Sequence, residues 1–149
     1  MPLERGVVAA HDQPVQRGSV IVRAIWAACL LVAGLNHART LFQHGLLWDY
    51  GGVGWPSATY WSSLTLLDPI VAALLFVRPV AGVRATLVLI ATNVAHNLAI
   101  PARYAPEGEF LTRISNPFFI SQVGFMLFAA ATAHLALRHP KAGREAKST

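Results

Sequence analysis

Residues 92–101, TNVAHNLAIP, end a long apolar run that begins near Ala81. Asn93, His96 and Asn97 are spaced i, i+3 and i+4, so a helix places all three on one face. If the run crosses a membrane, these polar side chains need hydrogen-bond partners inside the protein, because hydrocarbon supplies none. A polar cluster of this kind in a membrane helix predicts a functional site.

The composition of the chain favours a membrane protein. Of the 149 residues, 54% are hydrophobic and 13% are charged, whereas soluble domains carry about a quarter charged residues. Charge is nearly absent from four stretches, which predict membrane-spanning helices at about 20–41, 59–77, 83–101 and 117–137. The predicted fold is all-α: a polytopic four-helix membrane bundle over residues 19–137, flanked by polar cytoplasmic tails at 1–18 and 138–149.

Lysine and arginine are distributed unevenly on the two sides of these spans. The side that carries the termini holds Arg5, Arg17, Arg23, Arg78, Arg84, Arg138, Lys141, Arg144 and Lys147, and the other side holds only Arg39, Arg103 and Arg113. The positive-inside rule therefore predicts that both termini are cytoplasmic. The net charge of +5 is a topology signal, since no basic helix face or aromatic platform indicates nucleic-acid binding. The expected partner is the lipid bilayer.

In this orientation, polar residues of all four spans fall at one depth in the outer half of the membrane. They are Asn36, His37, Asn93, His96, Asn97 and Gln122, with Asp68 just beneath them. Asp68 lies about 13 Å from the start of its helix, near the middle of a hydrocarbon layer about 30 Å thick. A carboxylate there costs a few kcal/mol unless it is neutralised or paired. The layer predicts a small-molecule pocket between the helices.

Each polar residue of the layer has a predicted role and a competing one. We expect Asp68 and His96 to exchange protons with a bound molecule, and the others to bind it. The imidazoles of His37 and His96, on different helices at similar depth, are alternatively axial ligands of a b-type haem or of a metal ion. The competing hypothesis is that the amides and imidazoles only join helices through hydrogen bonds of about 0.6–2 kcal/mol each.

Two other residue types complete the site prediction. The single cysteine, Cys29, excludes a disulfide or a thiolate metal site within one chain, and no other metal site is predicted. The aromatic residues of the first loop and the second span predict an interfacial belt at the outer surface. They are Trp48, Tyr50, Trp55, Tyr60 and Trp61.

The order of short motifs resembles the DoxX-like group of small four-helix bacterial membrane proteins, over roughly Ile21 to Leu137. The motifs are GLNH at 34–37, LDP at 67–69 with its buried acid, RPVAG at 78–82, and a third span that ends in polar residues with a histidine. The sequence departs from the group where Asn36-His37 replaces a charged residue and where Pro69 follows the acid. The resemblance implies an inner-membrane bundle, and some relatives are quinone-linked oxidoreductase subunits. It transfers no catalytic residue.

The leading hypothesis is an integral protein of the bacterial inner membrane that binds a quinone or another amphipathic molecule as a subunit of a redox chain. A second hypothesis is a proton-coupled small-molecule carrier or binding protein, with Asp68 as the coupling group. A third is a ligand-free membrane scaffold or assembly factor. The sequence fixes neither enzymatic activity, nor the ligand, nor whether the chain forms a homo-oligomer or joins a membrane complex.

Overall fold

The computed structural model describes residues 4–46, 48–50 and 52–138, with side chains described from Arg17 onward. The helices are α1 (Glu4–His44), α2 (Trp55–Val77), α3 (Pro79–Tyr104), α4 (Phe110–Ile114) and α5 (Pro117–Ala136). No strand occurs in these ranges, so the predicted all-α class is confirmed. Four segments are long and apolar enough to cross a membrane, as in a multi-pass membrane protein: Arg17–His44, Trp55–Val77, Pro79–Tyr104 and Pro117–Ala136.

Apart from shifts of a few residues at other helix ends, the helices differ from the sequence prediction at three places. Helix α1 begins at Glu4, so residues 4–18, predicted as a polar tail, extend the first span as helix. Propagating an existing helix is much easier than nucleating one. The loop after the third span contains the short helix α4. Residues 139–149 of the predicted C-terminal tail lie outside the described residues.

The third difference is the connection between α2 and α3, because the predicted spans 59–77 and 83–101 leave residues 78–82 outside the helices. Only Arg78 interrupts the two helices, and Gly82 lies within α3. A Cβ at Gly82 would lie 2.4 Å from the Leu75 backbone nitrogen, so only glycine permits this approach. The Leu75 carbonyl would face the nitrogen of Pro79, which has no hydrogen, and the Arg23 Nη1 of α1 donates to it instead at 3.1 Å.

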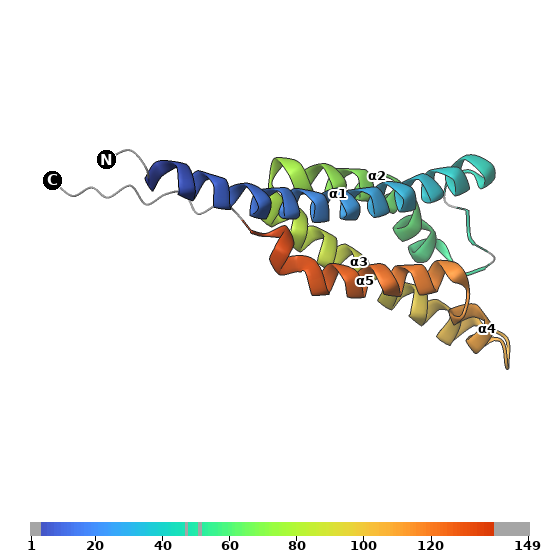
Figure 1. Cartoon of the computed structure of the whole chain (residues 1–149). Helices are drawn as coiled ribbons and strands as arrows, with labels where there is room; N and C mark the ends of the chain where they lie inside the picture. Colours follow the sequence, from blue (N-terminus) through green and yellow to red (C-terminus); the bar gives the residue numbers. More distant parts are fainter. Residues whose placement is uncertain (1–3, 47, 51, 139–149) are drawn as a thin grey trace.

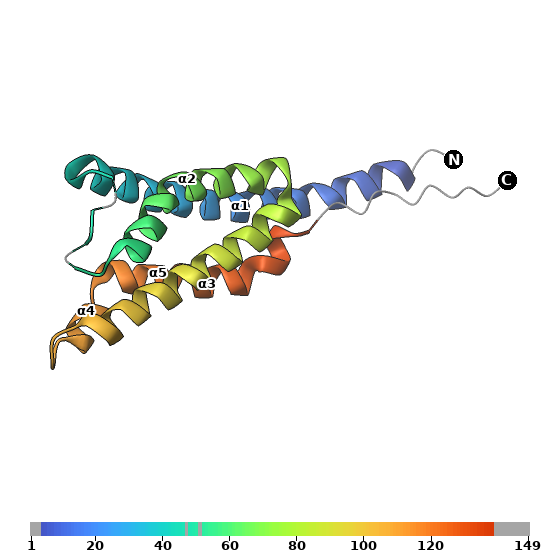
Figure 2. The same cartoon turned by 180° about the vertical axis from the view of Figure 1, so that it is seen from behind.

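The four long helices pack in a ring of neighbours. Helix α1 contacts α2 and α5, and α3 contacts the same two helices (Figure 1). The pair α1 and α2 diverges from the pair α3 and α5 toward the end of the molecule that carries α4, in both views (Figure 2). We call this end the α4 end. The opposite end, where the described chain starts and stops, is the terminal end.

The tightly packed core lies toward the terminal end. Its fully buried side chains include Trp26 of α1, Leu75 of α2 and Val83 of α3. The Trp26 Nε1 donates to the Thr132 Oγ1 at 3.1 Å and thereby joins α1 to α5. Large apolar side chains are exposed on all four long helices, for example Val32, Leu66, Val88 and Leu127. Such a surface suits contact with lipid rather than water.

Candidate functional site

Two cavities lie between the long helices where their two pairs diverge. The inner cavity has a volume of about 450 Å³, and its polar lining consists of Asn36, His37, Asp68, Asn93, Ser121 and Gln122. The rest of its lining is apolar except for Cys29. The outer cavity, of about 700 Å³, lies at the α4 end and includes Tyr50, Trp61, Asn97, Tyr104, Arg113 and Phe119 in its lining. Phe118 and Gln122 line both cavities.

Asp68 borders the inner cavity from α2. Its side chain is only 4% exposed, and among the described residues no hydrogen bond or ion pair reaches its carboxyl group. Gly34 of α1 permits this position, because a Cβ on the glycine would lie 3.1 Å from the Asp68 Cβ. Pro69 cannot donate to the carbonyl of Thr65, and the Thr65 Oγ1 is itself buried without a partner. Asp68 therefore lies in a part of α2 where several polar groups lack hydrogen bonds to other described residues.

The amides of the polar layer form a hydrogen-bonded cluster at the boundary between the two cavities. The Trp61 Nε1 donates to the Asn97 Oδ1 at 2.9 Å. The Asn97 Nδ2 donates to the Asn93 Oδ1 at 3.2 Å and to the Gln122 Oε1 at 2.7 Å. This amide cluster joins α2, α3 and α5. Asn93 and Gln122 border the inner cavity, whereas Asn97 borders the outer one.

His96 does not line the inner cavity that Asp68 borders, although the sequence predicted that both side chains serve one bound molecule. Its ring packs against Tyr60 at 4.5 Å and against the edge of Trp61 at 5.2 Å, measured between ring centroids. It lines neither cavity, and its buried Nε2 has no hydrogen-bond partner in the part of the chain that the structure describes. The reason is geometric, since adjacent helix positions differ by about 100°. Asn93 and Asn97 face the centre, and His96 is turned toward α2.

The positions of His37 and His96 show whether the two imidazoles could ligate one haem. His37 borders the inner cavity from α1, but His96 borders neither of the two cavities and packs against the rings of Tyr60 and Trp61. These residues do not fit a haem held between the two imidazoles. In the described part of the chain, no group of three or more His, Cys, Asp or Glu side chains could hold a metal ion.

Trp61 is the member of the site that the sequence analysis assigned only to an interfacial belt. Its indole donates to Asn97, and its ring ends a series of ring contacts at the α4 end that runs through His44, Trp48 and Tyr50. The signal was present in the spacing, because Trp61 and Asp68 are seven residues apart and share one face of α2.

Tyr50 holds the first loop against this site. Its φ of 52° lies in the left-handed region that side-chain-bearing residues rarely adopt. Its ring is fixed between Trp48 and Trp61, with centroid distances of 4.7 and 4.5 Å. Burial raises the pKa of the Tyr50 phenol, so the hydroxyl stays neutral at physiological pH. The loop therefore forms a neutral aromatic wall of the outer cavity.

The fold and the site together define a class: a multi-pass helical protein with cavities between its membrane-spanning helices. The chain matches no family model, and no curated protein or solved structure matches it. The resemblance to DoxX-like proteins stays a prediction from the motifs quoted above.

Proposed function

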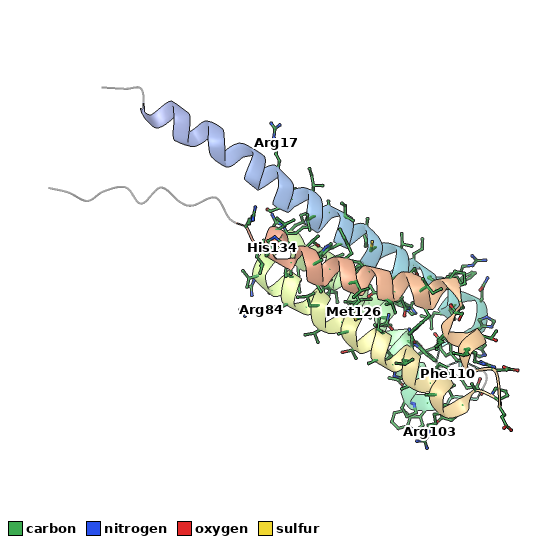
Figure 3. All side chains as sticks on the ribbon, turned by 60° about the horizontal axis from the view of Figure 1, so that its bottom comes forward. Arg17, Arg84, Arg103, Phe110, Met126 and His134 are labelled. Atoms are coloured by element: carbon green, nitrogen blue, oxygen red, sulfur yellow. The ribbon has the colours of Figure 1, made fainter. Side chains whose placement is uncertain are left out.

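We propose that this chain is a DoxX-like four-helix bundle of the bacterial inner membrane that binds a quinone or a similar amphipathic molecule in its inner cavity, in the outer half of the membrane, as a subunit of a redox chain. Both termini face the cytoplasm in this proposal. The distribution of charge supports the orientation, because Arg17 and Arg84 lie at the terminal end and Arg103 lies at the opposite end (Figure 3).

The observation that carries the proposal is the Asp68 carboxyl at the wall of a largely apolar cavity, which has no hydrogen-bond or ion-pair partner among the described residues. An ionisable group in a membrane helix is expensive, and it is expected where it serves a ligand or a proton path. The cavity volume of about 450 Å³ falls within the range of small-molecule sites. An apolar wall with a few convergent polar groups suits a ring that carries oxygens and an apolar tail.

Access to the inner cavity supports a lipid-soluble ligand. Val32 of α1 and Phe118 of α5 both line the cavity, and each is 69% exposed on the surface of the molecule. The hydrogen bond that joins these two helices, from Trp26 to Thr132, lies toward the terminal end. A molecule dissolved in the bilayer can therefore reach the cavity between α1 and α5.

In this proposal, the residues of the inner cavity have two roles, proton transfer and ligand binding. Reduction of a quinone oxygen to a hydroxyl needs a proton, and Asp68 can donate or accept it. His37 is the second titratable side chain at the same cavity. The amides of Asn93 and Gln122 hold the ring oxygens in place. Electrons are supplied by another subunit of the redox chain, which is the expected membrane partner.

Two measurements on the purified protein test this proposal. We expect mass spectrometry of the protein in mild detergent to detect a co-purifying lipid-soluble molecule, and the protein to bind a 1,4-benzoquinone with a decyl tail. Asp68→Asn should abolish proton-linked turnover while the protein still inserts, and Glu107→Gln in the exposed loop before α4 is the matched control. A wild-type protein that carries no such molecule and does not bind the quinone would overturn the proposal.

The two adjoining cavities favour a second candidate, a proton-coupled carrier. Phe118 and Gln122 form a wall common to both cavities, which together extend from the α4 end to Asp68. Under this hypothesis, a solute passes from one cavity to the other with a proton on Asp68. Solute-dependent acidification of proteoliposomes tests it. If Asp68→Asn is silent in both assays, the third candidate, a ligand-free scaffold, is supported.

A further inference from the structure

Trp61 determines which groups donate and which accept in the hydrogen bonds of the amide cluster. An indole N–H can only donate, so the atom of Asn97 that faces Trp61 must be the carbonyl oxygen. The Nδ2 of Asn97 therefore points the other way. Its two hydrogens are both used, one on the Asn93 Oδ1 and one on the Gln122 Oε1. Trp61 thus removes the usual ambiguity of amide orientation from all three side chains.

This direction determines what Asn93 and Gln122 can offer to a ligand. The carbonyl oxygen of each already accepts a hydrogen bond from Asn97, whereas its NH₂ group, with two hydrogens, has no acceptor among the described residues. Both residues border the inner cavity. Asn93 is 6% exposed, so its NH₂ group is available to the inner cavity rather than to the outer surface of the molecule. The wall of the inner cavity between α3 and α5 therefore presents hydrogen-bond donors.

We infer that Trp61 and Asn97 are positioning residues that make the inner cavity select ligands with carbonyl oxygens over ligands with hydroxyl groups at the same places. Neither residue borders the inner cavity, so both act through Asn93 and Gln122. A carbonyl oxygen accepts hydrogen bonds and brings no hydrogen that needs an acceptor. A hydroxyl oxygen is a weaker acceptor than a carbonyl oxygen. A hydroxyl group also brings a hydrogen that needs an acceptor, and the NH₂ groups of Asn93 and Gln122 offer none. The inference rests on the proposed function, since it requires a ligand in the inner cavity.

The test compares two probes that differ only in oxidation state: a decyl-substituted 1,4-benzoquinone and its hydroquinone. We measure the Kd of each for the full-length protein in mild detergent and take the ratio. The wild type should favour the quinone about ten-fold, the size expected when one buried polar group changes from paired to unpaired. Trp61→Phe keeps a ring but removes the fixed donor, so the ratio should fall toward one.

Asn97→Asp provides the sharper test because it should invert the preference. A carboxylate accepts from Trp61 and also requires donors on its other side. Asn93 and Gln122 then turn their NH₂ groups toward position 97 and their oxygens toward the cavity, which favours the hydroquinone. Trp55→Phe is the matched control, since Trp55 is 76% exposed; its ratio should equal that of the wild type.

A measurement on the wild type keeps the test valid if a variant does not fold. The infrared carbonyl stretch of ¹³C-labelled quinone should shift to lower frequency on binding, because the carbonyl oxygens accept hydrogen bonds. An unshifted band, or a Kd ratio that is the same in wild type, Trp61→Phe and Asn97→Asp, overturns the inference while the proposed function stands. A wild type that binds neither probe overturns the proposed function itself.

Discussion

Gly34 of α1 lies directly against Asp68 of α2, so closely that a Cβ on the glycine would be 3.1 Å from the Asp68 Cβ and 3.3 Å from the Pro69 Cδ. This contact brings the two helices together beside the inner cavity. In Gly34→Ala, the steric conflict with these atoms should therefore offset the gain of about 1 kcal/mol in the free energy of unfolding that alanine gives over glycine within a helix. Gly124→Ala, where a Cβ meets nothing within 4 Å, is the control and should stabilise the protein. Thermal unfolding in detergent compares the two variants.

Gly82→Ala should be far more destabilising than Gly34→Ala. The new Cβ would lie 2.4 Å from a backbone nitrogen of α2, and a backbone cannot move aside as a flexible side chain does. We expect a loss of about 3 kcal/mol in the free energy of unfolding. Guanidinium or SDS titration of the purified variant measures it. A stability equal to that of Gly124→Ala would contradict the close approach of α2 and α3.

Thr132→Val should weaken the contact between α1 and α5. The substitution preserves the shape of the side chain but leaves the buried Trp26 Nε1 without an acceptor. An unsatisfied buried donor costs about 1–3 kcal/mol. Thr92→Val on the exposed side of α3 is the matched control and should change the stability by less than about 0.5 kcal/mol. Equal melting temperatures for the two variants would show that the bond contributes nothing.

Asp68→Leu should stabilise the protein and remove its activity. The carboxyl is buried with no partner among the described residues, so an apolar side chain relieves a desolvation cost of about 1–3 kcal/mol. A residue that is retained for function often lowers the stability of the folded protein in this way. The melting temperature and quinone binding of one preparation should change in opposite directions. A loss of stability would indicate that Asp68 has a structural partner.

The helical spans could be predicted from the sequence, whereas the directions of the polar side chains could not. Four apolar stretches of about 20 residues in a chain with little charge allow few alternatives to membrane helices. The depth of each polar residue along its helix could also be predicted from the sequence. The inner cavity is indeed bordered by five of these residues: Asn36, His37, Asp68, Asn93 and Gln122. Rotation about the helix axis depends on the neighbouring helices, which sequence spacing does not specify.

His96 and Trp61 illustrate this limit. The i, i+3, i+4 pattern placed His96 with the two asparagines, but an aromatic pocket formed by α2 determines where its ring packs. Trp61 looked like a surface anchor until its indole was seen to donate to Asn97. Both outcomes depend on contacts between helices that are distant in the sequence. The start of α3 at Pro79 likewise depends on the fit of Gly82 against Leu75.

Photoaffinity labelling with an azido-substituted decyl quinone, followed by mass spectrometry of the peptides, tests the central claim most directly. The account predicts that the label attaches to residues of the inner cavity, such as Cys29, Ala33 or Phe125, and that excess unlabelled quinone prevents this. Labelling confined to lipid-facing side chains such as Leu66 or Val88, without protection by competitor, would contradict a ligand site beside Asp68.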